Sequence, residues 1–374
     1  MIEGVGSVLV VGGGVGGMAT AISLRKAGVA VDLIDLDPEW RVYGAGITIT
    51  GATLRAYRQL GLLERLKVEG AVTNGTRLRH FSGSIIADLD EPSIEDGLPA
   101  TGGILRPVLH RIMSDEVRKA GVAVRLGITV DSISSDSHGV DVRLSDGSSG
   151  RYDLLIGADG INSRVRSLLF PGPDGPRYTG QAAWRVLANR PADFDKCEFY
   201  LGHPHMAGIT ACSPDKVYAF LLNCDPEMTW IEPADQLDRM RELLADFGGN
   251  LGVIRDELGP ESSVVYRPLE AWIQPRPWHA GRAILLGDAA HATTPHLASG
   301  AGMAVEDALV LTEELVRHTP DIDAALAAFT ERRFERCRFV VDSSISIGEA
   351  QIARDFEFVH TMIGKALHKL AEPI

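Results

Sequence analysis

A glycine-rich turn near the N-terminus constrains the fold of this chain most strongly. Residues 12–17 read Gly-Gly-Gly-Val-Gly-Gly, which satisfies the pattern G-x-G-x-x-G. The run at residues 7–11 is apolar and β-branched, as expected for a parallel strand buried on both faces. In such a strand–turn–helix unit Gly12 allows the tight turn and Gly14 lets a pyrophosphate approach the backbone. Gly17 lets the helix pack closely on the strand.

An acidic residue makes this turn more specific. Asp35 lies 23 residues after Gly12, at the end of the second predicted strand. A carboxylate at that place accepts hydrogen bonds from a ribose diol and repels a 2′-phosphate. The N-terminus of the intervening helix attracts the negative charge of a pyrophosphate. Together these features predict a bound dinucleotide rather than a purely structural glycine turn.

The composition fits a globular protein that does not bind nucleic acid. The 374 residues include 37 basic and 50 acidic side chains, and the net charge of −13 is spread along the chain. An acidic surface repels phosphate backbones. The apolar N-terminal run follows an acid and is interrupted by glycines, unlike a signal peptide. No other run reaches the length of a membrane span. We therefore expect a cytoplasmic protein without a membrane span.

The order of the predicted elements indicates a discontinuous nucleotide-binding domain. Buried strand patterns return at residues 152–156 and 282–286, long after the first two strands. After Pro171-Gly172-Pro173 the chain reads mostly as antiparallel strands, and residues 75–90 read as a hairpin of the same sheet. We assign residues 1–73, 100–172 and 280–335 to the nucleotide-binding domain, 74–99 and 173–279 to an inserted sheet, and 336–374 to a C-terminal helical segment.

Two further motifs place acids at the expected ligand edge of the sheet. Asp159-Gly160 and Gly287-Asp288 each follow a buried strand. Ligands of open α/β sheets bind at the carboxyl ends of the strands, and a cofactor with a polyol chain offers hydroxyls to such acids. Alternatively, Asp159 and Asp288 only cap the helices that follow them. The residues alone leave both interpretations open.

Two histidines in residues 287–308 suggest a metal site at first sight. His291 and His296 lie five residues apart across Pro295, so they share no helix face. The region offers no obvious fourth ligand. We therefore predict no metal, and expect His291 to pack behind the cofactor and His296 to face the active site.

The three motifs, in this order, resemble the FAD-dependent aromatic hydroxylases of the para-hydroxybenzoate hydroxylase type. The resemblance spans nearly the whole chain and is closest in pattern to the 6-hydroxynicotinate, salicylate and urate hydroxylases. It implies an α/β fold with a Rossmann-like FAD-binding domain, an inserted antiparallel-sheet substrate domain and long C-terminal helices. It also implies FAD as cofactor, NADH or NADPH as transient electron donor, and O2 and a small aromatic compound as substrates.

The resemblance also implies residue roles. Asp288 would hold the ribityl chain, Arg106 would contact the ribityl or phosphate region, and Arg166 would serve the nicotinamide donor. The backbone of residues 300–303 would face the N1/O2 edge of the flavin. Ala298-Ser299 stands where many members carry Gly-Gln, which removes a side-chain contact but not the backbone role. The full set of implied FAD contacts is Gly12, Gly14, Val15, Gly17, Asp35, Gly46, Arg106, Val130, Asp159, Gly160, Gly287, Asp288, Pro295, Gly300, Ala301, Gly302 and Met303.

The inserted sheet would form the ceiling over the substrate. Comparison with the urate and hydroxynicotinate hydroxylases suggests that His205 and Tyr218 contact the substrate. His203 and Arg185 suit a carboxylate or an enolised heteroaromatic ring, and Thr48 could line the pocket. The alternative is that these are sheet-edge or packing residues. The substrate-binding candidates are Thr48, Arg185, His203, His205 and Tyr218, and the catalytic candidates are His205, Tyr218 and His296.

The expected function is that of a single-component monooxygenase, which hydroxylates a small aromatic or N-heteroaromatic compound through a flavin C4a-hydroperoxide. Two alternatives remain open, an FAD-dependent reductase of the same superfamily and a flavin-binding sensor without turnover. The long helices expected between residues 321 and 370 offer a face for a homodimer.

Overall fold

The computed structural model describes residues 2–42, 44–91 and 93–374. Its larger part is built on a six-stranded sheet in the order β18-β19-β12-β1-β2-β8, which is parallel from β19 to β8 and antiparallel at β18. The strands are β1 (Ser7–Val11), β2 (Ala30–Asp35), β8 (Ala123–Leu126), β12 (Leu154–Gly157), β18 (His279–Ala280) and β19 (Ala283–Leu285). This sheet is the predicted α/β layer, completed by a strand from far downstream.

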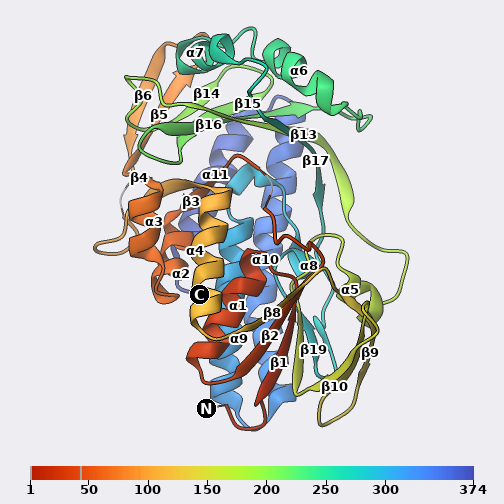
Figure 1. The fold of residues 1–374 in the computed structure, drawn as a ribbon. Helices are drawn as coiled ribbons and strands as arrows, with labels where there is room; N and C mark the ends of the chain where they lie inside the picture. Colours follow the sequence, from red (N-terminus) through yellow and green to blue (C-terminus); the bar gives the residue numbers. More distant parts are fainter. Residues whose placement is uncertain (1, 43, 92) are drawn as a thin grey trace.

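Helices cover one face of this sheet, and a small antiparallel sheet lies on its other side (Figure 1). Helix α1 packs against both α4 and α9, while β11 contacts β1. The apolar side chains between these layers form one continuous core. The elements are α1 (Val15–Lys26), α4 (Arg106–Lys119), α9 (Gly300–His318), β9 (Val130–Ser135), β10 (Val140–Leu144) and β11 (Ser149–Tyr152).

The inserted segment forms a seven-stranded sheet in the order β17-β13-β16-β15-β14-β5-β6. The hairpin expected at residues 75–90 is confirmed, because β5 and β6 pair antiparallel and β5 joins β14. The strands are β5 (Gly75–His80), β6 (Ile85–Asp90), β13 (Arg177–Asn189), β14 (Cys197–Leu201), β15 (Met206–Ala211), β16 (Lys216–Cys224) and β17 (Val264–Ala271).

Helices α6 (Gln236–Leu243) and α7 (Gly249–Glu257) cover the outer face of this sheet, where they bury a second core around Trp184 and Phe247 (Figure 1). The sequence pattern of residues 233–247 by itself predicts a single helix. The structure has a 3-10 turn (Pro233–Asp235) before α6, and α7 as a separate helix. Helix α6 ends at Leu243, and α7 begins at Gly249, whose φ of 58° is a left-handed conformation that glycine allows.

The long C-terminal helices are present, and one of them crosses a predicted boundary. Helix α10 is continuous from Ile322 to Ile352, so the boundary expected at residue 336 falls inside it. The assignment of residues 336–374 to a separate segment stays a prediction. The remaining elements are β3 (Gly46–Thr50), α2 (Gly51–Gln59), α3 (Leu63–Glu69), β4 (Ala71–Thr73), β7 (Thr101–Leu105), α5 (Arg164–Leu169), α8 (Asp288–His291), η2 (Pro295–Leu297) and α11 (Phe356–Ala371).

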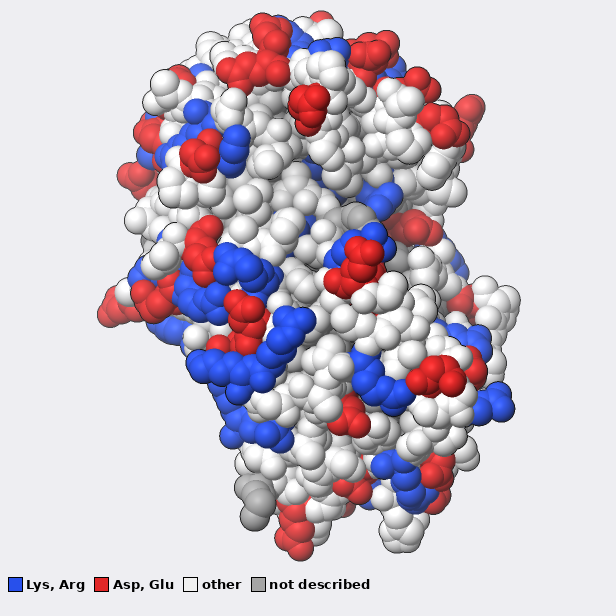
Figure 2. Space-filling view, viewed as in Figure 1, with Lys and Arg blue, Asp and Glu red and all other residues white. Residues whose placement is uncertain are grey.

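Acidic and basic side chains lie next to one another over much of the face drawn in Figure 2. Ion pairs account for part of this mixture; for example, Glu69 binds both Arg65 and Arg111. Among the helices that the structure describes, none is long and apolar enough to cross a membrane.

Candidate active site

The predicted acids gather at one edge of the six-stranded sheet. Gly12 follows β1, Asp35 ends β2, Asp159 follows β12 and Asp288 follows β19. Because these four strands are parallel neighbours, their carboxyl ends meet at the same edge. This is the edge at which open α/β sheets bind ligands.

The glycines of the first turn differ in the room around them. A Cβ on Gly12 would lie 2.3 Å from the carbonyl oxygen of Ala158, and one on Gly17 would lie 1.8 Å from the carbonyl oxygen of Gly12. A Cβ on Gly14 would meet nothing within 4 Å, so this backbone is open to a ligand. Helix α1 also lacks a side-chain cap, which leaves its first amides available for a pyrophosphate.

Asp35 holds this turn in place. Its Oδ2 accepts a hydrogen bond of 2.6 Å from the Gly13 amide, and its Oδ1 accepts one of 2.8 Å from the Asp37 amide. The indole of Trp40 donates to the Gly13 carbonyl at 2.9 Å. Each carboxylate oxygen can accept a further bond, so the half-buried Asp35 is able to bind a ribose diol as well.

Asp288 begins helix α8 at this edge of the sheet. Its side chain is exposed to solvent, yet burial by the surrounding protein raises the pKa of its carboxyl, against the opposing effect of His291 and Arg106. Arg106 has no ion pair with any residue that the structure describes. Its side chain passes close to Gly44 (φ 121°), where a Cβ would lie 2.7 Å from the Cδ of Arg106.

The turn before α9 presents three free amides. The first hydrogen bond inside this helix runs from the Met303 amide to the Ser299 carbonyl at 2.8 Å, and no side chain caps the helix. The amides of Gly300, Ala301 and Gly302 are therefore open to a ligand. Ser299 donates to the Leu297 carbonyl at 2.7 Å, so its hydroxyl serves the turn itself.

Asp159 acts as a helix cap. Its carboxylate accepts hydrogen bonds from the Ser163 hydroxyl at 2.5 Å and from the Val165 amide at 3.0 Å. The observed contacts of Asp159 are therefore those of a helix-capping residue. A contact between Asp159 and a cofactor stays a prediction. The neighbouring Gly160 has open space where a Cβ would stand.

Arg166 binds backbone carbonyls of the protein. Its guanidinium is buried and donates to the carbonyls of Ala289 at 3.0 Å and Ile161 at 2.7 Å. It ties the Asp159-Gly160 turn to helix α8. These contacts describe a structural use of the guanidinium, and its expected role toward the nicotinamide donor stays a prediction.

Tyr218 and Thr48 meet where the inserted sheet covers the nucleotide-binding domain. Their hydroxyl groups hydrogen bond to each other, and Thr48 also bonds to Thr210 at 3.3 Å. A Cβ on Gly46 would lie 2.2 Å from Cδ1 of Tyr218, so glycine is what allows this approach. The half-buried ring of Phe220 continues this ceiling next to Tyr218.

Arg185 lies on the same face of the sheet as Tyr218 and carries an unpaired charge. Burial and the nearby guanidinium of Arg106 lower the pKa of Arg185 to about 10, and Arg267 adds to this effect. Arg185 forms no ion pair with the described residues. Arg267, which the sequence did not single out, shares this face because it pairs with Ala183, two positions before Arg185. The alternation of side chains between the two faces of β17 is the sequence signal that could have identified Arg267.

The histidines do not join this group. His203 lies between Phe81 and Phe247, with ring centroids at 5.5 and 4.4 Å, and His205 packs beside His203. Both therefore lie with the helices on the outer side of the sheet, away from Tyr218. Burial lowers the pKa of His205 to about 4.

His296 is buried, and its Nδ1 hydrogen bonds to the Thr294 hydroxyl at 2.8 Å. A Cβ on Gly348 of α10 would lie 3.3 Å from its Nε2, so His296 faces that helix instead of an open pocket. Val130 is fully buried, so its backbone alone could meet a cofactor, and Pro295 begins the turn η2.

The residues fit FAD. An open backbone at Gly14 beside an uncapped helix suits the pyrophosphate, Asp35 suits a ribose, and Asp288 suits the ribityl chain. The free amides at the start of α9 suit the anionic edge of a reduced flavin. These features lie along one sheet edge, in the order that an extended dinucleotide requires.

Comparisons with known proteins agree with this fit. A family model described as an FAD binding domain matches residues 6–344. A putative FAD-dependent monooxygenase (YetM) of Bacillus subtilis is 34% identical over 342 residues, which are 91% of this chain and 92% of the relative. The 2-heptyl-3-hydroxy-4(1H)-quinolone synthase of Pseudomonas aeruginosa is 30% identical over 349 residues, 91% of this chain and 88% of the relative. The crystal structure of Klebsiella pneumoniae HpxO with FAD and uric acid has the same fold, with a TM-score of 0.85 at 24% identity, covering 97% of this chain and 92% of that one.

Proposed function

Because the chain belongs to the FAD binding domain family and is an FAD-dependent aromatic monooxygenase, we propose that NADH or NADPH supplies its electrons and that its substrate is a small, anionic aromatic or N-heteroaromatic ring. The balanced reaction is substrate–H + O2 + NAD(P)H + H⁺ → substrate–OH + H2O + NAD(P)⁺. A C–H bond of the ring becomes C–OH, the second oxygen atom leaves as water, and the nicotinamide is oxidised.

FAD supplies the oxygen chemistry when it is bound, and the residues of the chain bind, orient and shield the reactants. The ceiling formed by Tyr218 and Phe220 is aromatic, with the two ring planes tilted by 42° to each other, and it offers apolar ring surface that excludes water from the substrate. The Thr48–Tyr218 hydroxyl pair can exchange a proton or a hydrogen bond with a phenolic oxygen of the substrate.

The observation that carries the anionic preference is the unpaired charge of Arg185. A desolvated guanidinium beside two further arginines is unfavourable unless an anion joins it. Arg106 is expected to serve FAD, which leaves Arg185 and Arg267 for a carboxylate or enolate of the substrate. The quinolone named for one relative and the uric acid in one structural neighbour support an N-heteroaromatic ring.

The test begins with the visible spectrum of the purified protein after addition of FAD. NADH and NADPH oxidation is then measured with pairs of hydroxylated benzenes, pyridines and quinolines that differ only by a carboxylate, and incorporation of label from ¹⁸O2 into product is measured. We expect labelled product and a preference of at least tenfold in kcat/KM for the anionic member of a pair. Flavin reduction without labelled product would identify a reductase, and the absence of any turnover would favour a sensor.

The variant Arg185→Met tests the role of this arginine. We expect KM for the anionic substrate to rise about 10- to 150-fold, because a desolvated charge-assisted contact contributes about 1.5–3 kcal/mol. The exposed Arg143 of β10 provides the control variant Arg143→Met, for which KM should not change. An equal effect of Arg185→Met on neutral and anionic rings would refute the anionic preference.

A further inference from the structure

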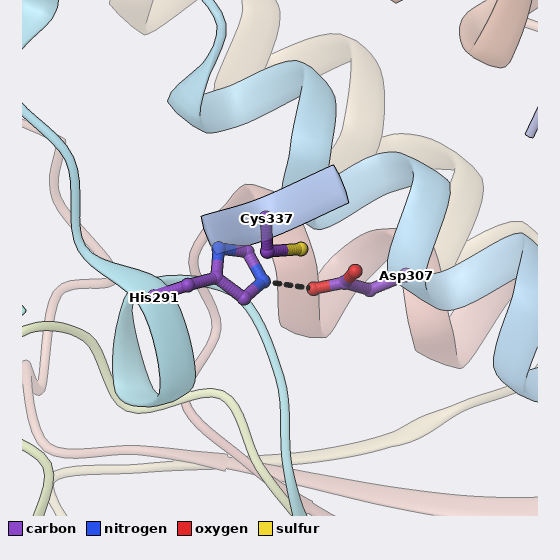
Figure 3. A group of neighbouring side chains, drawn as sticks. All are labelled: His291, Asp307 and Cys337. Carbon is purple, nitrogen blue, oxygen red and sulfur yellow. Dashed lines mark hydrogen bonds and ion pairs between the residues drawn. The ribbon is translucent and has the colours of Figure 1, made fainter. Parts of the chain in front are cut away.

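A cluster of fully buried charges lies directly behind the cofactor edge. Asp307 of α9, His291 of α8 and Arg333 of α10 are 0%, 2% and 1% exposed. Figure 3 shows the imidazole of His291 and the carboxylate of Asp307 pointing at each other, with Cys337 of α10 beside them. The His291 Nε2 and Asp307 Oδ2 atoms are 2.6 Å apart, and the Nε of Arg333 donates to Asp307 Oδ1 at 2.8 Å.

His291, Asp307 and Cys337 have the chemistry of a metal site, and their ligand atoms lie within 4.8 Å of one another. Two observations argue against that use. Both oxygens of Asp307 already accept hydrogen bonds, and the guanidinium of Arg333 next to them would repel a cation. Arg333 also pairs with Glu306 at 2.9 Å, and Glu306 pairs with Arg336 at 2.9 Å, so both buried carboxylates are already neutralised by cations of the protein. The cluster is therefore a hydrogen-bonded ion network.

Asp307 connects two segments that bind FAD. Its Oδ2 accepts a hydrogen bond of 2.9 Å from the amide of Gly287, the residue before Asp288. Asp307 itself belongs to α9, whose first residues carry the free amides. Arg333, held by Asp307, also donates to the Met303 carbonyl at 3.3 Å in the first turn of that helix.

We propose that Asp307 is a positioning residue for the flavin, which sets the place of the Asp288 carboxylate relative to the amides of residues 300–302. Gly287 has a φ of 57° and directly precedes helix α8. The hydrogen bond from its amide to Asp307 holds the start of this helix in place. Loss of the Asp307 charge would free this turn and leave His291 and Arg333 without a shared acceptor. The proposal rests on the FAD site and not on the identity of the substrate.

The experiment compares Asp307→Asn with Glu306→Gln, a neutralised carboxylate in the same buried network that has no contact with Gly287. The dissociation constant of FAD is measured with each apoprotein by flavin fluorescence, and the thermal midpoint of each apoprotein by calorimetry. We expect the dissociation constant of FAD to rise at least tenfold for Asp307→Asn and less than threefold for Glu306→Gln. The thermal midpoint should fall by a similar amount in both variants. Equal changes for the two variants, or no change for Asp307→Asn, would overturn the proposal.

Hydrogen exchange gives a readout that does not depend on FAD. In the apoprotein, the peptide covering residues 286–291 should exchange at least tenfold faster in Asp307→Asn than in Glu306→Gln. Unaltered exchange in that peptide would refute the positioning role. If Asp307→Asn does not fold, His291→Gln replaces it in both measurements. This variant removes the 2.6 Å contact between His291 of α8 and the carboxylate of Asp307. A failure of the hydroxylation assay alone would leave these binding and exchange results unaffected.

Discussion

The hydroxyl of Tyr218 on β16 hydrogen bonds to the hydroxyl of Thr48 on β3, and this contact joins the inserted sheet to the nucleotide-binding domain. Gly46, two residues before Thr48, leaves the space that the tyrosine ring occupies. The contact therefore sets the distance between the inserted sheet and strand β3 of the nucleotide-binding domain. A substrate held between the ceiling and the flavin would lie next to this hydroxyl pair.

Removal of the Tyr218 hydroxyl should affect turnover more than stability. In Tyr218→Phe the ring keeps its packing, and Thr48 keeps its bond to Thr210. We expect a loss of about 1 kcal/mol in the free energy of unfolding. The value of kcat/KM should fall about 10–100-fold with FAD affinity unchanged, as for the loss of one orienting hydrogen bond to the substrate. Steady-state kinetics and urea unfolding measure the two effects.

Tyr200→Phe provides a matched control on the opposite face of the same sheet. Tyr200 donates to buried Glu198 at 3.0 Å, so its hydroxyl also contributes to stability, but it faces α7. Its variant should lose a similar amount of stability and retain kcat/KM. Equal kinetic effects of the two variants would show that Tyr218 acts only through packing.

Asp288 should stabilise the complex with FAD while destabilising the apoprotein. Burial raises the pKa of Asp288, so the folded protein binds its proton more tightly than the unfolded chain does. At pH 7 the ionised carboxylate is then unfavourable for folding. Asp288→Ala should raise the thermal midpoint of the apoprotein and raise the dissociation constant of FAD at least tenfold.

Asp159→Ala should have the opposite effect on stability at the same sheet edge. Burial raises the pKa of Asp159 as well, but its carboxylate accepts hydrogen bonds from Ser163 and Val165 that the variant loses. Its carboxylate caps α5, so the variant should lose about 1 kcal/mol of stability. Calorimetry of both apoproteins distinguishes the two acids. A lower thermal midpoint for Asp288→Ala, with unchanged FAD affinity, would contradict the role assigned to this residue.

The parts of the fold that follow from backbone chemistry could be predicted from the sequence. The turn at residues 12–17 and the acids at strand ends depend on local pattern, and the structure places Asp35 and Asp288 at one edge. The position of Arg166 could not be predicted, because its partners Ala289 and Ile161 are backbone carbonyls brought together only by tertiary contact.

In the inserted sheet, the face on which a side chain lies could likewise not be predicted from the sequence at every position. His203 and His205 stand in the turn between β14 and β15, where one residue more or less moves a side chain to the other face. The sequence contains no sign of which face α6 and α7 cover. Tyr218 and Arg185 lie inside strands, and the pairing of Tyr218 with Leu187 places both on the face toward the nucleotide-binding domain.

Ala298 should be replaceable by glycine with a gain in stability. It adopts φ 47° and ψ 29° at the end of the turn η2, a left-handed conformation. This costs an L-residue about 1–2 kcal/mol, whereas glycine adds about 0.4–1 kcal/mol of chain entropy to the unfolded state. We expect Ala298→Gly to increase the free energy of unfolding by about 0.5–1 kcal/mol in urea. Ala327→Gly, exposed inside α10, is the control and should lose about 1 kcal/mol.

The ion pair behind the flavin should make the apoprotein sensitive to acid. Burial by itself would raise the pKa of Asp307, but the charges of His291 and Arg333 outweigh it and lower the pKa to about 2. Since this folded-state pKa lies below 3.8, the ordinary pKa of an aspartate, the carboxylate contributes stability above pH 4 and loses it as the pH falls through 2. The contribution is about 2 kcal/mol. In urea unfolding of the apoproteins, the difference between wild type and Asp307→Asn should therefore shrink by about that amount between pH 5 and pH 2. A difference that stays constant over this range would mean that Asp307 is not ionised in the folded protein.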